Sequence, residues 1–185
     1  MFIDKFELLN SISLLPHNFI LFYYGNFLLK INVIIHLPIA FYYHSYLIFN
    51  NINKIDNNLR RLDQTTQLIC SCILTFITLK SIIYTLFVSI INIYFIEKLW
   101  NSKYTNDNKR WIDIMIDIFL YMIPIFLYEN GIYYFFIGII PISLTGILTF
   151  YYKIKKIQYI FHLSLIPLSY VLIEIEKNNY YNYKI

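Results

Sequence analysis

Residues 131–152 read GIYYFFIGIIPISLTGILTFYY, a stretch without a single acidic, basic or histidine side chain. A helix needs about 20 predominantly apolar residues to cross the hydrocarbon core of a bilayer. Apolar runs of nearly this length recur along most of the 185 residues, separated by polar clusters or by Pro and Gly residues. The stretch therefore predicts one membrane-spanning helix, and its recurrence predicts an all-α, polytopic, integral membrane protein.

The composition agrees with a membrane protein. Hydrophobic residues make up 58% of the chain and charged residues 14%, whereas an ordinary soluble domain contains about 25% charged residues. The net charge of +4 is scattered, and no basic run is interleaved with aromatic residues, so we expect membrane lipids but no nucleic acid as partners. We also expect no cleavable signal peptide, because Asp4, Lys5 and Glu7 mix both signs of charge and no small-residue cleavage pattern follows.

The separators divide the chain into seven candidate helices within a single domain. We expect them at residues 12–29, 31–49, 64–80, 82–98, 112–128, 131–152 and 157–174, with ends accurate to a few residues. The fifth and sixth are joined by YENG, a tight turn in which Gly131 stands where a helix C-cap favours glycine. The fold class is thus predicted to be a seven-transmembrane-helix bundle.

The positive charges predict the orientation of this bundle. With seven spans, eleven of the fifteen lysines and arginines fall on the side of the N-terminus and four on the other. The larger group is Lys5, Lys54, Arg60, Arg61, Lys98, Lys103, Lys109, Arg110, Lys153, Lys155 and Lys156, and the smaller is Lys30, Lys80, Lys177 and Lys184. Because Lys and Arg are enriched in short cytoplasmic loops, we predict a cytoplasmic N-terminus.

Strongly polar residues stand near the cytoplasmic ends of three of these helices. His44 lies near the end of the second, Asp63 opens the third, and His162 lies in the first turns of the seventh. We predict all three at the same membrane depth, where a charged or polar group is costly and marks a functional site by default. The structural alternative is that Asp63 pairs with Arg60 or Lys156.

These residues carry a resemblance to a known family. AFYYH ends at His44, LRRLDQT contains Asp63, and QYIFHL places Gln158 and His162 four apart on one helix face. This order resembles the hemolysin III and progestin/adipoQ receptor family, and more distantly the alkaline ceramidases, which are grouped together as seven-span metal-dependent hydrolases. The family pattern is Ser-x-x-x-His ending the second span, Asp opening the third, and His-x-x-x-His in the seventh.

The resemblance implies a zinc site. Carried over by position, His44 and His162 would bind the metal, and Asp63 would be the catalytic residue that orients the metal-bound water. Ala40 stands at the serine position, however, and Gln158 stands at the position of the first histidine in the last motif. Since catalytic zinc usually has three protein ligands and a Gln carbonyl is a poor substitute for imidazole, we expect zinc binding to be weak or absent.

The function implied by the resemblance is zinc-dependent hydrolysis of a lipid amide or ester. Bound metal would lower the pKa of water towards about 7 and polarise the substrate carbonyl. Two alternatives stay open. One is a receptor-like or structural membrane protein without catalysis, and the other is a small channel or an accessory subunit of a membrane complex.

Several other polar residues are expected to be structural. His36 precedes His44 by two turns, about 11 Å along a helix, and is interpreted as a buried hydrogen-bonding histidine. His17 is interpreted as interfacial. Cys70 and Cys72 would face different directions on a helix, and a C-x-C without a second pair is not a zinc motif, so we expect them to act as small buried hydrophobes.

The paired aspartates of the fifth helix receive a similar interpretation. Asp113 and Asp117 lie four apart, shortly after Lys109 and Arg110. Paired carboxylates can perform acid–base catalysis. Here we expect them instead to snorkel and to pair with these neighbouring cations, with Asp113 at the membrane interface.

Overall fold

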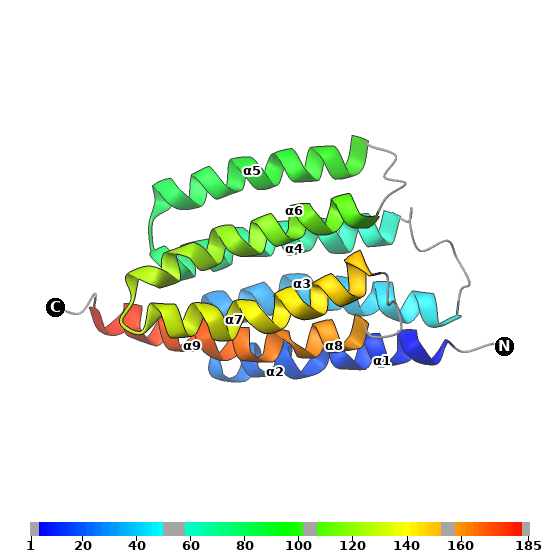
Figure 1. The fold of residues 1–185 in the computed structure, drawn as a ribbon, viewed down its shortest axis with the longest axis horizontal. Coiled ribbons are helices and arrows are strands. Elements are labelled where there is room, and N and C mark those ends of the chain that lie inside the picture. The colour runs from blue at the N-terminus through cyan, green and yellow to red at the C-terminus, as the bar shows by residue number, and fades with distance from the viewer. Residues whose placement is uncertain (1–3, 50–57, 102–106, 153–157, 183–185) are drawn as a thin grey trace.

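The computed structural model describes residues 4–49, 58–101, 107–152 and 158–182, and within these ranges it contains helices and no strand. The helices form seven rods that run side by side (Figure 1). In chain order the rods are α1 (Lys5–Ser13) with α2 (Leu15–Tyr24); α3 (Phe27–Phe49); α4 (Asn58–Leu79); α5 (Ile82–Asn101); α6 (Asp107–Met122) with the 3-10 turn η1 (Ile123–Leu127); α7 (Gly131–Gly146) with the π-helical turn η2 (Ile147–Tyr151); and α8 (Gln158–Leu163) with α9 (Leu165–Asn182). Each rod corresponds to one predicted helix.

The two termini lie at opposite ends of the bundle (Figure 1). The end that carries the N-terminus, here called the N-terminal end, also carries the last turns of α3 and α5 and the first turns of α4, α6 and α8. The C-terminus and the start of α3 lie at the other end, here called the C-terminal end. Successive rods therefore alternate in direction.

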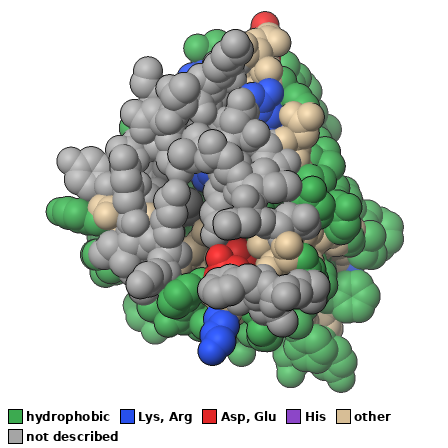
Figure 2. Space-filling view, turned by 90° about the vertical axis from the view of Figure 1, so that its right-hand side faces the viewer, with side chains coloured by type: hydrophobic (Ala, Val, Ile, Leu, Met, Phe, Trp, Pro, Cys, Tyr) green, Lys and Arg blue, Asp and Glu red, His purple; other side chains and the backbone are tan. Residues whose placement is uncertain are grey.

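Five helices are long and apolar enough to cross a membrane. They are Phe27–Phe49, Asn58–Leu79, Ile82–Asn101, Gly131–Thr149 and Gln158–Asn178. Large hydrophobic side chains are exposed along the rods, including Phe27, Ile83, Ile90, Leu127 and Tyr133. Figure 2 shows hydrophobic side chains around the sides of the molecule when it is viewed onto its N-terminal end. These features are consistent with an integral membrane protein.

The first rod begins earlier than residue 12, where the sequence placed its start. The Asp4 carboxylate accepts hydrogen bonds from the backbone N–H groups of Phe6 and Glu7 at 3.0 and 3.3 Å and so caps α1. An acidic cap followed three residues later by Glu is a known signature of a helix start.

Helix α1 also has the reverse of the amphipathic pattern seen on a water-facing helix. Its buried residues are Glu7, Asn10, Ser11 and Ser13, whereas Phe6, Leu8, Leu9 and Ile12 are exposed. A helix on the surface of a soluble protein turns its apolar stripe inward. The inside-out pattern of α1 is therefore suited to an apolar surrounding and a polar interior.

The turn between the fifth and sixth rods differs in detail from the expectation. Asn130, not Gly131, takes the left-handed conformation, with a φ of 58°. Gly131 is the first residue of α7, and a Cβ there would collide with the carbonyl oxygen of Ile125. Glycine is therefore needed at position 131 because the backbone of η1 lies where a Cβ would be, and not because residue 131 caps the end of a helix.

The apolar core lies towards the C-terminal end. The side chains that are almost completely inaccessible include Leu29, Ile77, Met122, Ile125, Leu172 and Ile175. They come from the start of α3, the ends of α4 and α6, the 3-10 turn η1 and the middle of α9, which lie in the half of the bundle towards that end (Figure 1). Polar side chains are consequently concentrated in the middle and towards the N-terminal end.

Candidate functional site

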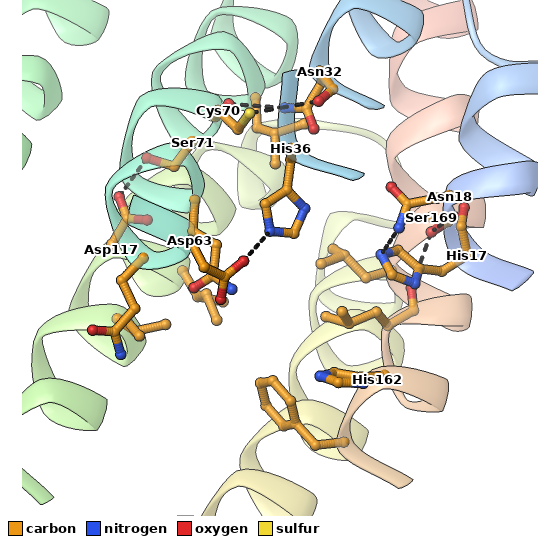
Figure 3. A pocket seen from close by; sticks show the side chains of 18 of the residues that line it. His17, Asn18, Asn32, His36, Asp63, Cys70, Ser71, Asp117, His162 and Ser169 are labelled. Carbon is orange, nitrogen blue, oxygen red and sulfur yellow. Dashed lines mark hydrogen bonds and ion pairs between the residues drawn. The ribbon is translucent and has the colours of Figure 1, made fainter. Parts of the chain in front are cut away.

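A cavity of about 200 Å³ lies between the rods. All four histidines of the chain line it, namely His17, His36, His44 and His162. Three buried carboxylates, Glu7, Asp63 and Asp117, line it as well. Its apolar wall is formed by Leu21, Leu74, Ile114, Ile118, Leu165, Leu168 and Leu172. Figure 3 shows several of these polar side chains turned into the space between the helices.

The first polar group in the cavity joins α1 to α3. The imidazole Nδ1 of His44 lies 3.2 Å from Oε2 of Glu7, and the Asn10 amide donates to the same oxygen at 3.1 Å. An ionised carboxylate can only accept, so Nδ1 of His44 carries the hydrogen and Nε2 keeps its lone pair. Glu7 therefore fixes both the orientation and the tautomer of His44.

His162 is held in the same tautomer by different partners. Its Nδ1 lies 3.1 Å from the backbone oxygen of Asn10 and 2.9 Å from Oγ of Ser13. Because a carbonyl oxygen can only accept, Nδ1 is the donor and Nε2 keeps its lone pair. The rings of His44 and His162 meet edge to face with their centroids 5.1 Å apart. The structure thus brings these two predicted site residues together.

Asp63 faces His36. Its Oδ1 lies 3.4 Å from Nε2 of His36, without the geometry of a hydrogen bond (Figure 3). Arg60 lines the same cavity, and Lys156 is outside the described residues. His36 precedes His44 by eight residues, about 12 Å along a helix axis. Asp63 therefore pairs with a residue two turns away from His44, which differs from the shared depth that the sequence predicted.

The zinc site implied by the resemblance can be tested on its donor atoms. Gln158 is half-buried, begins α8 and lines the cavity. Among the described residues, no group of three His, Cys, Asp or Glu side chains is placed to hold a metal ion. Two imidazoles, an amide, and a carboxylate that faces His36 do not make the three-ligand set of a catalytic zinc.

The two aspartates of α6 have separate environments. Both oxygens of Asp113 accept hydrogen bonds from Nζ of Lys98, at 2.8 Å each. Asp117 is buried, lines the cavity, and accepts a hydrogen bond of 2.6 Å from the hydroxyl of Ser71. The expected pairing with the cations at 109–110 lies outside the described side chains.

His17 is also buried, with 6% of its surface exposed, and it lines the cavity. The Asn18 amide donates to its Nε2 at 2.9 Å, which places the hydrogen on Nδ1. That Nδ1 has no hydrogen-bond partner in the described part of the chain. It is therefore a donor held beside the cavity without an acceptor.

The two cysteines are free thiols that face different surroundings. Cys70 is buried and lines the cavity, and the backbone oxygen of Asn32 lies 3.5 Å from its sulfur. Cys72 is half-buried and contacts the backbone oxygen of Leu68 at 3.5 Å. This agrees with the expectation that the two side chains point in different directions.

Glu7 is a cavity residue that the sequence analysis missed. Glu7, Asn10, Ser13 and His17 recur at intervals of three or four residues, which places them on one helix face. A polar stripe in an otherwise apolar segment is a usable signal. It was obscured because the acidic residues near the N-terminus were considered only as evidence about a signal peptide.

No protein-family model matches the chain, and searches of curated proteins and of solved structures find no significant match.

Proposed function

We propose that the chain is a seven-span membrane protein with a cytoplasmic N-terminus, and that its cavity hydrolyses a lipid amide or ester. One observation carries the proposal: all four histidines and three buried carboxylates line the same cavity. Ionisable groups within a membrane are costly and are retained where they serve a function. The motif order that resembles hemolysin III supports the same proposal.

Two features support seven spans in addition to the five helices that meet the length and apolarity requirement. The α1–α2 rod turns Phe6, Leu8, Leu9 and Ile12 outward and polar groups inward, as a lipid-facing segment would. The α6–η1 rod lies alongside the others in Figure 1. The excess of Lys and Arg at the N-terminal end supports a cytoplasmic location for that end.

The cavity is better suited to a reaction chamber than to a channel. Its polar groups lie in the middle and N-terminal parts of the rods, whereas Leu29, Ile77, Ile125 and Ile175 fill the C-terminal end and are completely buried. A conducting pore needs polar or hydrated surroundings along its whole length. An apolar core that closes one end supports access from one side or from the lipid.

His44 is the proposed general base. Its Nε2 takes a proton from water while Glu7 stabilises the resulting imidazolium through Nδ1–H. The hydroxide oxygen adds to the substrate carbonyl carbon, and collapse of the intermediate breaks the C–N or C–O bond. The imidazolium then returns its proton to the leaving nitrogen or oxygen, so the products are a carboxylic acid and an amine or alcohol. His162 borders the same space, and its Nε2 also keeps its lone pair.

Asp63 and His36 form the second place where water can be activated. Oδ1 of Asp63 and Nε2 of His36 are buried without hydrogen-bond partners in the described residues, and they lie 3.4 Å apart. Buried polar atoms without a protein partner are commonly satisfied by an ordered water. In the proposal Asp63 keeps the role of a residue that orients water, at a deeper level than His44.

The test is hydrolysis by purified protein in vesicles, measured on a panel of fluorogenic lipid amides and esters. We expect activity that is lost in His44→Ala and reduced in Asp63→Asn. Asp113→Asn is the matched control, because Asp113 lies outside the cavity lining. No turnover above protein-free vesicles on any substrate, or turnover unchanged in both His44→Ala and Asp63→Asn, would refute the proposal.

A second candidate is a receptor-like protein without catalysis. It is favoured by the incomplete zinc donor set, since a binding pocket needs no metal. Saturable binding of a lipid without turnover would support this candidate.

A further inference from the structure

The three buried carboxylates of the cavity differ in their partners. Glu7 faces the imidazole of His44, and Asp63 faces that of His36. Asp117 has no histidine, lysine or arginine partner among the described residues, and its carboxylate is hydrogen-bonded by the hydroxyl of Ser71 and by the side chain of Asn92. Its carboxylate is thus the one of the three without a basic neighbour in the described part of the chain.

The hydrogen-bonding partners of Asp117 in the described part of the chain are neutral. Ser71, which donates to Asp117 at 2.6 Å, accepts in turn from the Asn92 amide at 2.6 Å. Ile114 and Ile118 of the same helix also line the cavity. An ionised carboxylate in such a place is strongly disfavoured unless it is paired. A cation supplied from outside the chain would complete this environment.

Other atoms around the cavity indicate that it accepts a polar ligand. Nδ1 of His17, Oε1 of Gln64 and Oγ1 of Thr149 are all buried without a hydrogen-bond partner among the described residues. These residues are each more than nine-tenths buried and line the same cavity as Asp117. Because buried polar groups in native proteins are usually satisfied, unpaired ones around a cavity point to a ligand or to water.

We propose that the cavity binds a protonated aliphatic amine, with the ammonium group paired to Asp117 and the aliphatic body against the apolar wall. Arg60 is the one Lys or Arg side chain in the described lining, and it precedes Ser71 by eleven residues, about 16 Å along α4. Close to Asp117 the charge is therefore that of its own carboxylate, which disfavours an anionic ligand. A metal cation is disfavoured because Na⁺-like or Ca²⁺-like ions require several oxygen ligands, whereas an ammonium needs few acceptors.

The volume of the cavity limits the size of the amine that can be used to test the proposal. About 200 Å³ corresponds to roughly seven waters at their share of liquid volume. Hexylamine is of this size, and hexanol and hexanoic acid match its chain with a neutral and an anionic head. The proposal does not depend on hydrolysis, because binding is measured without turnover.

The experiment follows the thermal unfolding midpoint of the full chain in a non-ionic detergent, at fixed pH and ionic strength, as each probe is added. We expect hexylamine to raise the midpoint in a saturable manner, because a ligand that binds the folded state stabilises it by mass action. Hexanol should raise it less and hexanoic acid least. Asp117→Asn, which keeps an oxygen for Ser71, should weaken the apparent affinity for hexylamine at least 10-fold.

Asp113→Asn is the matched control on the same helix, because Asp113 pairs with Lys98 and does not line the cavity. It should bind hexylamine as the natural chain does. The amine–alcohol comparison in the natural chain tests the proposal even if Asp117→Asn does not fold. The proposal is overturned if hexylamine has no saturable effect, or if hexanol has an effect equal to that of hexylamine. It is also overturned if Asp117→Asn binds hexylamine with unchanged affinity. Finally, it is overturned if NaCl competes with hexylamine more strongly than an equal concentration of choline chloride does.

Discussion

Replacing Glu7 by Leu should destabilise the protein strongly, although it exchanges a buried charge for an apolar side chain. Oε2 of Glu7 accepts from Asn10 at 3.1 Å and from His44 at 3.2 Å, and both donors are buried. Removing the acceptor leaves two buried donors without this partner, at a cost of about 1–3 kcal/mol each. The expected loss is therefore about 2–6 kcal/mol, less whatever the apolar side chain recovers by packing.

Glu7→Gln separates the two contributions. Both donors use Oε2, so the amide oxygen of Gln can still accept from Asn10 and His44, but it carries no negative charge and the NH2 group puts a donor in place of the other carboxylate oxygen. We expect roughly half of the loss seen for Glu7→Leu, about 1–3 kcal/mol. For a chain of this length, 1 kcal/mol corresponds to a shift of about 2–4 °C in the unfolding midpoint, so both variants are measurable.

The assay is equilibrium unfolding in mixed micelles, followed by tryptophan fluorescence, with thermal midpoints as a second measure. Glu174→Gln is the control, because Glu174 is exposed and its pair with Lys177 is a surface ion pair worth at most about 1 kcal/mol. If Glu7→Leu unfolds within about 0.5 kcal/mol of the natural chain, or if the control loses as much, the buried Glu7–His44 contact is not a stabilising feature.

Three further predictions follow from the topology, the metal site and one turn. A reporter fused after Ile185 should lie on the non-cytoplasmic side, as judged by its activity in cells, and a cytoplasmic reporter would contradict seven spans. The natural chain should bind zinc weakly, and Gln158→His should raise the zinc stoichiometry of purified protein because residue 158 lies one turn from His162. Unchanged stoichiometry would mean that the cavity lacks ligand geometry. Gly131→Ala should lower stability by about 1–3 kcal/mol, because its Cβ would collide with Ile125, and an unchanged unfolding midpoint would contradict this.

The positions of the rods along the chain could be predicted where they depend only on neighbouring residues. A membrane-crossing helix satisfies its own backbone hydrogen bonds, so the length of an apolar run and its polar separators are sufficient to place it. The prediction for α5 began at residue 82 and that for α7 at residue 131, and both starts match. The start of α1 was wrong because a short polar segment with a helix cap resembles a loop when only hydropathy is considered.

The site was predictable only in part. His44 and His162 lie together, and Gln158 and Asp63 line the same cavity. The partner of Asp63 was not foreseen, and neither was the burial of Asp117, because each depends on which face its helix turns inward. Hydropathy can indicate which face of a helix is polar, but it does not indicate which neighbouring helix that face will meet.

The sequence by itself determined the helical class, the number of rods and their alternating order, since these follow from runs of neighbouring residues. Only the tertiary structure decided which polar groups meet. Glu7 reaches His44 across 37 residues, Ser71 reaches Asp117 across 46, and Ser13 reaches His162 across 149. Such contacts depend on the axial offset between rods, and a shift of a single turn, about 5.4 Å, exchanges one partner for another.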